Sequence, residues 1–192
     1  GVVTSDESET SLQTHLDKLQ EINQKLDAQH YLNGSLLKLP PAGAAQKANT
    51  AVSLDRLRDL NQALRKFPAN FHPNPKLVKA VEKRRQILDD PDSVSIDWTT
   101  AEELAFASIL EDGVAIRMTG QDTPRGTFSQ RHAVFYDADT SSSYTPIHAI
   151  PQAKASFEIH NSPVSEAGPF GFEIGYNVQA PDRLVLWEAQ YG

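Results

Sequence analysis

The chain has 192 residues, a formal net charge of −7 and no cysteine. This length suits one domain with a sizeable core, with or without an extended arm. The absence of cysteine excludes disulfides, thiolate nucleophiles and cysteine-ligated metals. The acidic balance argues against general affinity for nucleic acid or anionic membranes.

No apolar run reaches the roughly 18 residues that a transmembrane helix needs, and no signal-like segment opens the chain. We therefore expect a cytoplasmic protein, or one of the mitochondrial matrix if the source is a eukaryote, with no membrane partner and no nucleic-acid partner. Because the chain starts at Gly1 and stops at Gly192 directly after a motif, we also expect it to be part of a longer protein.

Residues 1–30 are predicted to form an amphipathic helical arm. Its apolar side chains recur three or four positions apart, which draws one stripe along a helix. They are Leu12, Leu16, Leu19, Ile22 and Leu26. Residues 31–52 contain the run LPPAGAAQKANT and are predicted to form a linker, because prolines, glycine and small residues dominate it.

Residues 53–95 predict a pair of helices. The first is capped by Ser53 and ended by Pro68, and the second begins at Asn74 and Pro75. The positions expected to be buried are leucines and valines at helical spacing: Leu54, Leu57, Leu60, Leu64, Leu77, Val78, Val81 and Leu88. Nine basic and three acidic residues between positions 55 and 85 suit either an acidic partner or a solvated helix face.

Residues 96–192 alternate helices and strands. A capping box at Thr100 and Glu103 is predicted to open a helix that runs through Leu110 and ends before Gly113. The predicted strands are VAIRMT, HAVFYD, SFEIH and RLVLWEAQ, and a further helix follows Ser165. We therefore expect an α/β fold, in which a mostly parallel sheet has helices on both faces and binds ligands at the carboxyl ends of its strands.

Residues 161–175, which read NSPVSEAGPFGFEIG, form the strongest candidate for a site. Ser165 is predicted to cap the helix, which puts Glu166 in its first turn. Gly168, Gly171 and Gly175 each weaken a helix, so together they predict a close approach by a neighbouring element or a ligand. The Glu166 carboxylate either acts in a site or only complements the helix dipole.

Five short motifs follow one another along the second half of the chain: GQDTPRGTF, the pair Arg131 and His132, YTPIHAI, HNSPVSE and LVLWEAQYG. In order and spacing they resemble 2-oxoglutarate dehydrogenase, the thiamine diphosphate-dependent decarboxylating component of its complex. The resemblance is dense over residues 96–192 and looser over residues 1–92. It implies that residues 96–192 are part of a pyrimidine-binding α/β domain of the transketolase type.

The resemblance implies a thiamine diphosphate site to which this chain contributes one face. Glu166 matches the family's glutamate that meets the aminopyrimidine ring nitrogen, which makes it the candidate catalytic and cofactor-binding residue. Tyr191 stands where an aromatic side chain packs against that ring, although it also fits an ordinary core position. We expect no metal site in the chain, because the family's magnesium site, a Gly-Asp-Gly followed by an asparagine, belongs to a different domain.

Arg125 and His132 are the candidate substrate residues. Two glycines bracket the loop of Arg125, and an arginine there can pair with a dicarboxylate in bidentate fashion. A structural role for Arg125, holding the loop through backbone carbonyls, is equally open. The sequence departs from the family at Gln130, where histidine is common, and at Pro169, which falls inside the predicted helix.

By resemblance, the whole protein decarboxylates 2-oxoglutarate and transfers the succinyl group to a lipoyl-bearing succinyltransferase component. A second subunit of a homodimer completes the cofactor site, so the segment alone is expected to be inactive. Two alternatives are open: a related enzyme that acts on 2-oxoadipate or pyruvate, and a non-catalytic module that holds a partner subunit.

Overall fold

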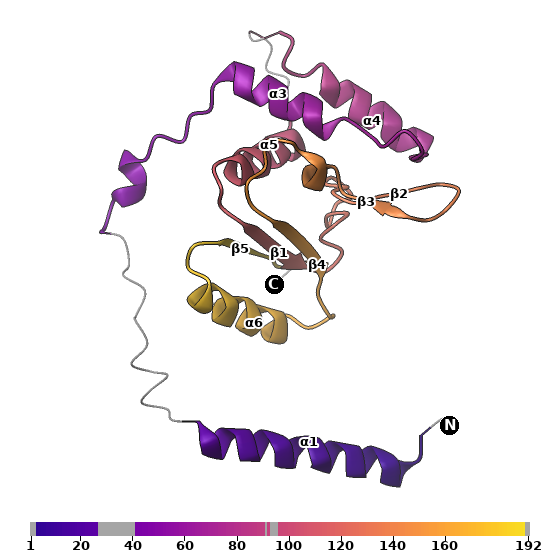
Figure 1. Ribbon diagram of the computed structural model, residues 1–192, viewed down its shortest axis with the longest axis vertical. Coiled ribbons are helices and arrows are strands. Elements are labelled where there is room, and N and C mark those ends of the chain that lie inside the picture. Colours follow the sequence, from indigo (N-terminus) through magenta and orange to yellow (C-terminus); the bar gives the residue numbers. More distant parts are fainter. Residues whose placement is uncertain (1–2, 27–40, 91, 93–95, 191–192) are drawn as a thin grey trace. The chain divides into compact units, whose positions relative to one another are not determined.

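The computed structural model describes residues 3–26, 41–90, 92 and 96–190, which belong to two compact units, residues 1–44 and 45–192 (Figure 1). Part of the predicted linker and the candidate residue Tyr191 lie outside the described residues. No helix in the described segments is long and apolar enough to span a membrane.

The first unit contains helix α1 (Ser5–Lys25), which begins with a capping box. The Thr4 side chain accepts the Glu7 amide, and the Glu7 carboxylate accepts the Thr4 amide at 2.8 Å. The predicted apolar stripe from Leu12 to Leu26 is present, but its side chains are 47–62% exposed and no residue of α1 is buried. Nothing among the described residues therefore covers this stripe.

A short turn, η1 (Ala44–Lys47), precedes two helices of the second unit, α3 (Leu54–Leu64) and α4 (Pro75–Arg85). The predicted caps of both helices are confirmed, because the side chains of Ser53 and Asn74 accept backbone N–H groups of their first turns. Local signals are enough for these helix starts, since a cap and its amide lie within three residues.

The burial of the helical pair follows the prediction in part. Leu60, Leu64, Val81 and Leu88 are buried, Leu54, Leu57 and Leu77 are partly buried, and Val78 is 39% exposed. The expectation for Val78 is wrong because α4 lies at the surface and buries Val81 alone among its residues.

Helix α5 (Trp98–Glu111) packs against both α3 and the sheet. Its N-cap is Asp97, whose carboxylate accepts the Thr100 amide at 2.7 Å. The predicted capping box at Thr100 and Glu103 is therefore wrong, because an aspartate three residues earlier takes the amide. Glu103 instead accepts a hydrogen bond from Arg65 of the preceding helical pair at 2.5 Å.

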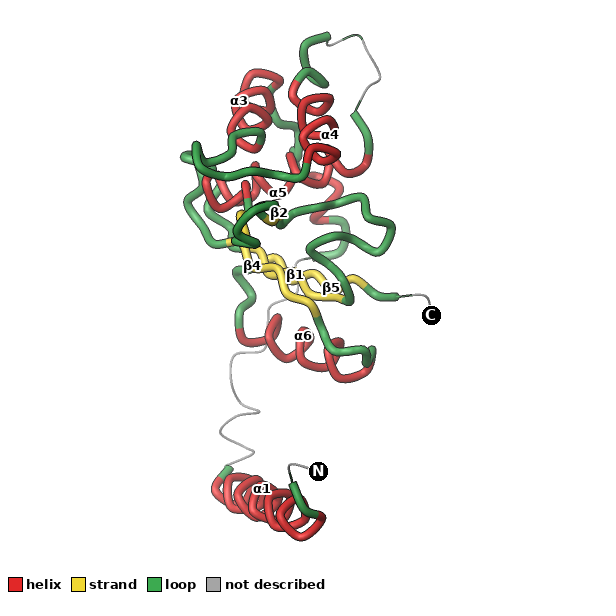
Figure 2. The backbone as a smooth tube through the Cα atoms, turned by 90° about the vertical axis from the view of Figure 1, so that its right-hand side faces the viewer, coloured by secondary structure: helices red, strands yellow, loops and turns green. Residues whose placement is uncertain are grey.

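Three parallel strands form the sheet in the order β4 (Phe157–Asn161), β1 (Ile116–Gly120) and β5 (Leu184–Glu188). The chain enters β1 after Gly113, whose φ of 90° ends α5 as predicted. Helix α6 (Ala167–Gln179) joins β4 to β5 and covers one face of the sheet, while α5 covers the other (Figure 1, Figure 2). The predicted α/β fold is confirmed.

The hydrophobic core lies where α3, α5 and the sheet meet. Its residues are contributed by segments far apart in the sequence, which is why the helical pair and the α/β part form one unit. Its buried members include Leu60, Leu64, Leu104, Phe106, Leu110, Ile116, Met118, Ile147 and Phe157.

The predicted strand HAVFYD does not join the sheet. It shortens to β2 (Phe135–Tyr136), which pairs antiparallel with β3 (Ser143–Tyr144) in a small hairpin. A turn of 3-10 helix, η2 (Pro146–Ala149), follows the hairpin and leads back toward β4. The expectation of a longer strand is wrong because the chain turns directly after Tyr136.

Asp137 causes this turn. Its buried carboxylate accepts the amides of His72, Asp139 and Thr140 at 2.6, 2.9 and 2.8 Å. These bonds, above all the one from His72, hold the pKa of Asp137 well below its ordinary value, because they stabilise the ionised form. The His72 ring also lies 2.9 Å from Asp139, but the Asp137 oxygens are already taken by amides, so we interpret the group as a turn and not as a metal site.

Candidate functional site

The carboxyl ends of the three parallel strands lie side by side. Gly120 of β1 is in register with Asn161 of β4 and with Glu188 of β5. The segments that follow the strands therefore meet at one edge of the sheet, where open α/β sheets bind ligands. This was the predicted position of the loop after β1, of the turn that carries Glu166 and of the segment after β5.

Hydrogen bonds join these three segments. Gln121, the first residue after β1, donates from Nε2 to Oε1 of Glu166 at 2.9 Å. Gln190, beyond β5, donates from Nε2 to the carbonyl oxygen of Gln121 at 3.3 Å and to the hydroxyl of Thr127 at 3.2 Å. The Glu166 carboxylate is therefore held by the loop of the central strand.

Glu166 occupies the N-cap position of α6, so the predicted cap at Ser165 is wrong. The helix begins at Ala167, and the Glu166 carboxylate makes no capping hydrogen bond. The carboxylate turns to Gln121 and away from the N–H groups of its own first turn. A role limited to complementing the helix dipole does not explain this orientation.

One oxygen of Glu166 has no partner. The side chain is half-buried, and its Oε2 is fully buried without accepting a hydrogen bond. Among the described residues, Glu166 is the ionisable one with such an atom. A buried acceptor without a donor costs about 1–3 kcal/mol, and more if it is charged. The site therefore fits a ligand that brings a donor to Oε2, such as a protonated ring nitrogen of a heterocyclic cofactor.

The start of the loop after β1 packs tightly against β5. A Cβ atom on Gly120 would lie 2.4 Å from Thr123 Oγ1 and 2.7 Å from the carbonyl oxygen of Glu188. Any side chain here would force the two segments apart, so glycine is required. This close packing fixes the position of Gln121, the next residue.

Gln130, where the family commonly has histidine, fills the interior of the same loop. Its Oε1 accepts the Phe128 amide at 2.9 Å, and its side chain lies against Gly126, which adopts a φ of 83°. The second departure from the family, Pro169, is buried in the first turn of α6. The helix tolerates it there because an N–H in the first turn has no partner within the helix.

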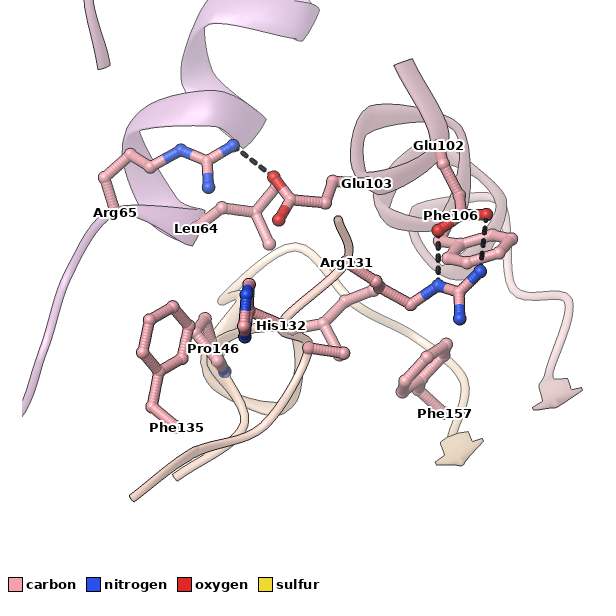
Figure 3. Close-up of a pocket in the computed structure, with 12 residues that line it drawn as sticks. Leu64, Arg65, Glu102, Glu103, Phe106, Arg131, His132, Phe135, Pro146 and Phe157 are labelled. Carbon is pink, nitrogen blue, oxygen red and sulfur yellow. Dashed lines mark hydrogen bonds and ion pairs between the residues drawn. The ribbon is translucent and has the colours of Figure 1, made fainter. Parts of the chain in front are cut away.

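Arg131 anchors the loop and was not predicted from the sequence. It is 4% exposed and donates to both oxygens of Glu102 on α5, at 2.5 and 3.1 Å (Figure 3). It also donates to Glu188 at 2.8 Å and to the carbonyl oxygen of Thr123 at 2.7 Å. Burial works against its charge, but the hydrogen bonds to Glu102 and Glu188 raise the pKa of Arg131 above its ordinary value.

The two predicted substrate residues line one cavity. Arg125 and His132 both face a cavity of about 490 Å³ that extends to Asn161 at the end of β4. The Arg125 guanidinium is exposed and donates to Asp122 and to Ser129 of its own loop, both at 2.8 Å. Arg125 therefore braces the loop through side chains, and not through the backbone carbonyls that the structural alternative expected.

His132 is held at the cavity by its backbone. Its φ of 46° lies in the left-handed region, and its amide donates to the carbonyl oxygen of Arg125 at 3.2 Å. Burial lowers the pKa of His132 below its ordinary value, and the positive charges of Arg84 and Arg125 lower it further. The imidazole is therefore neutral near pH 7 and can accept a proton.

A buried charge pair fixes α6 to the sheet. Glu173, which is 4% exposed, accepts hydrogen bonds from Arg117 of β1 at 2.9 and 3.0 Å and from the Thr119 hydroxyl at 2.8 Å. Gly171 and Gly175 lie on the opposite side of the helix, and no described residue would come within 4 Å of a Cβ atom there. The neighbour that these glycines predict is therefore not among the described residues.

Three residues that organise the site escaped prediction: Gln121, Arg131 and Gln190. Only their positions in the sequence could have indicated them, because each lies directly beyond a predicted strand or beside a candidate residue. That signal is weak, because polar side chains at such places are commonly solvated. Their partners became visible only once the register of the strands was known.

The fold and the site define the class of protein. Residues 94–192 match the family described as the pyrimidine-binding domain of transketolase. The chain belongs to the transketolase pyrimidine-binding domain family.

The relatives of the chain are more specific. Over 195 aligned residues it is 44% identical to proteins named 2-oxoglutarate dehydrogenase E1 component from Bacillus cereus (strain AH187) and Bacillus anthracis. Each alignment includes the whole chain but 20% of the relative, so the chain spans about a fifth of the length of these curated relatives. The resemblance drawn from the five motifs is confirmed.

Proposed function

We propose that this chain forms the pyrimidine-facing part of a thiamine diphosphate site in a 2-oxoglutarate dehydrogenase. The observation that carries the proposal is the buried Oε2 of Glu166, which lacks a donor at the carboxyl edge of the sheet. The family of residues 94–192 and the names of the relatives support the choice of cofactor and reaction. Thiamine diphosphate, when bound, supplies the nucleophilic carbon for decarboxylation of a 2-oxo acid.

In this proposal, Glu166 is the catalytic carboxylate. Its Oε2 would hold a proton between the carboxylate and a ring nitrogen of the bound cofactor, while Oε1 would keep its hydrogen bond to Gln121. Exclusion of water strengthens such a hydrogen bond, because the local dielectric constant is low. By the resemblance, Tyr191 would supply an aromatic contact to the ring, and magnesium would be bound by a domain outside this chain.

The cavity that Arg125 and His132 line is the proposed substrate-facing region. An arginine suits the distal carboxylate of 2-oxoglutarate, which accepts bidentate hydrogen bonds from a guanidinium. The neutral imidazole of His132 suits exchange of a proton with the reacting group. Pyruvate lacks the second carboxylate and would leave Arg125 without this partner, whereas 2-oxoadipate would retain it.

A second subunit and a lipoyl-bearing succinyltransferase component are the proposed partners, in the cytoplasm or the mitochondrial matrix. The outward face of α6 supports the second subunit, because large apolar side chains stay exposed beside Gly171 and Gly175. Phe172 is 60% exposed, Ile174 49% and Val178 52%. Apolar helix faces of this kind commonly mark an interface with another protein surface.

The test is Glu166→Gln in the full-length protein. The amide of the variant has the shape of the carboxylate and can still accept the hydrogen bond from Gln121, but it cannot exchange a proton with the cofactor. We expect kcat for 2-oxoglutarate to fall at least about 100-fold, the lower range for loss of an acid–base group. Glu9→Gln, an exposed glutamate of α1, is the matched control and should retain full turnover. Circular dichroism and size-exclusion chromatography monitor folding and assembly.

Unchanged turnover of Glu166→Gln would contradict the catalytic role and favour the interaction-module alternative. Measuring the wild-type protein with several 2-oxo acids addresses the substrate. If 2-oxoadipate or pyruvate were turned over better than 2-oxoglutarate, the protein would be the related dehydrogenase.

A further inference from the structure

The two oxygens of the Glu166 carboxylate have different surroundings. Oε1 accepts the Gln121 amide at 2.9 Å, while Oε2 is buried and free. The terminal torsion of a glutamate is soft, so a carboxylate with no partner turns easily. A directed bond to one oxygen removes that freedom and fixes where the other oxygen points.

We propose that Gln121 is a positioning residue that aims Oε2 of Glu166 at the ring nitrogen of the cofactor. This inference rests on the proposed function and adds to it the device that orients the catalytic group. A neutral amide suits the task, because it donates one directed hydrogen bond without placing a second charge beside the carboxylate.

Gln121 is itself held on two sides. The residue before it, Gly120, packs so closely against Thr123 and Glu188 that a Cβ atom has no room. The carbonyl oxygen of Gln121 accepts a hydrogen bond from Gln190, beyond β5, at 3.3 Å. A continuous set of contacts therefore runs from β5 through Gln121 to the Glu166 carboxylate. The orientation of the carboxylate follows from the strand register.

The test replaces Gln121 by methionine in the full-length protein. Gln121→Met keeps the length of the side chain but has no donor. Calorimetric titration with thiamine diphosphate and Mg²⁺ should show about tenfold weaker binding, the scale of one hydrogen bond to a charged group. kcat should also fall while KM for 2-oxoglutarate stays the same, because a misdirected carboxylate slows proton exchange with the cofactor but does not contact the substrate. A purely structural role would not separate kcat from KM in this way.

Two comparisons make the test specific. Gln62→Met replaces an exposed glutamine of α3 and should change neither quantity. In a Glu166→Ala background, Gln121→Met should have no further effect on cofactor affinity, because the side chain that it orients is gone. If Gln121→Met fails to fold, Gln121→Asn, which keeps the amide but shortens its reach, tests the same bond.

The positioning role is overturned if Gln121→Met binds thiamine diphosphate as tightly as wild type, or if its effect persists undiminished without the Glu166 carboxylate. The proposed function fails separately, if Glu166→Gln alone leaves both turnover and cofactor binding unchanged. A loss in Glu166→Gln with no effect of Gln121→Met would remove the positioning role and keep the catalytic one.

Discussion

Glu166 and His132 reach the site by different physical means. Glu166 is oriented by a side-chain donor, Gln121, that follows a strand remote from it in sequence. His132 is oriented by its own backbone, which adopts left-handed angles that are uncommon for a residue with a side chain. The orientation of Glu166 therefore depends on one hydrogen bond, whereas the orientation of His132 depends on the conformation of a whole loop.

The pKa of His132 offers a test of the cavity. Arg125→Gln removes one of the positive charges that, after burial, lower this pKa, so the pKa should rise toward the ordinary value of about 6.5. Titration of the ring protons by NMR measures it. Lys79→Gln, an exposed basic residue of α4, is the control and should leave the pKa unchanged.

The same pKa affects stability in a defined direction. Because the folded-state pKa of His132 is below its unfolded value, protonation opposes folding, and stability is lost as the pH falls through about 6.5. In Arg125→Gln this loss should be smaller. An unaltered pKa of His132 in Arg125→Gln would show that the two side chains do not share the cavity in solution.

Two arginines hold the secondary-structure elements around the site together: Arg131, which is buried, and Arg117, which is partly buried. Arg131 joins the loop after β1 to α5 through Glu102 and to β5 through Glu188. Arg117 joins β1 to α6 through Glu173. Such pairs are costly to break, because removing one partner leaves a charge in a poorly solvated place.

Arg131→Met should therefore destabilise the chain by about 2–4 kcal/mol. This loss is somewhat smaller than the loss expected when a fully buried ion pair is broken, because the Glu102 side chain is 31% exposed. Urea unfolding, followed by tryptophan fluorescence, measures the loss. Lys79→Met removes an exposed positive charge and should cost less than about 0.5 kcal/mol. Equal stability of Arg131→Met and wild type would mean that the two carboxylates find solvent without the arginine.

At the scale of the whole molecule, the two units differ in how they are stabilised. Residues 45–192 share a hydrophobic core to which α3, α5 and the sheet contribute. Residues 1–44 contain α1, which buries none of its residues. Most helical stability in proteins comes from tertiary packing, which α1 does not make among the described residues, so we expect most of the folding free energy to belong to the second unit.

Deleting residues 1–44 should leave the unfolding of the rest of the chain nearly unchanged, within about 0.5 kcal/mol. Trp187 on β5 reports on the second unit, and its urea midpoint and m-value are the quantities to compare. A clearly lower midpoint after the deletion would indicate that α1 stabilises the second unit.

Where the sequence predicted structure well, the signal was local. The caps at Ser53 and Asn74 lie next to the amides they bind, and the strands around Met118, Ile159 and Leu186 are short apolar runs between turns. The expectation for Thr100 failed because Asp97 accepts its amide. The expectation for Ser165 failed because the N-cap lies one residue later, at Glu166, whose carboxylate accepts a hydrogen bond from Gln121 and caps no amide. The contact with Gln121 joins residues 45 positions apart, so no local pattern includes it.

The linear chain was enough to predict the class of fold and the family, and it singled out Glu166 as a candidate, because apolar periodicity and motif order are properties of the sequence. Only the folded chain shows which oxygen of Glu166 lacks a partner, that Gln121 contacts the other oxygen, and how Arg131 holds the loop after β1. These features depend on parallel strands whose carboxyl ends come together from positions near 120, 161 and 188. The register of a sheet is set by packing between distant segments, so no local stretch of the sequence contains it.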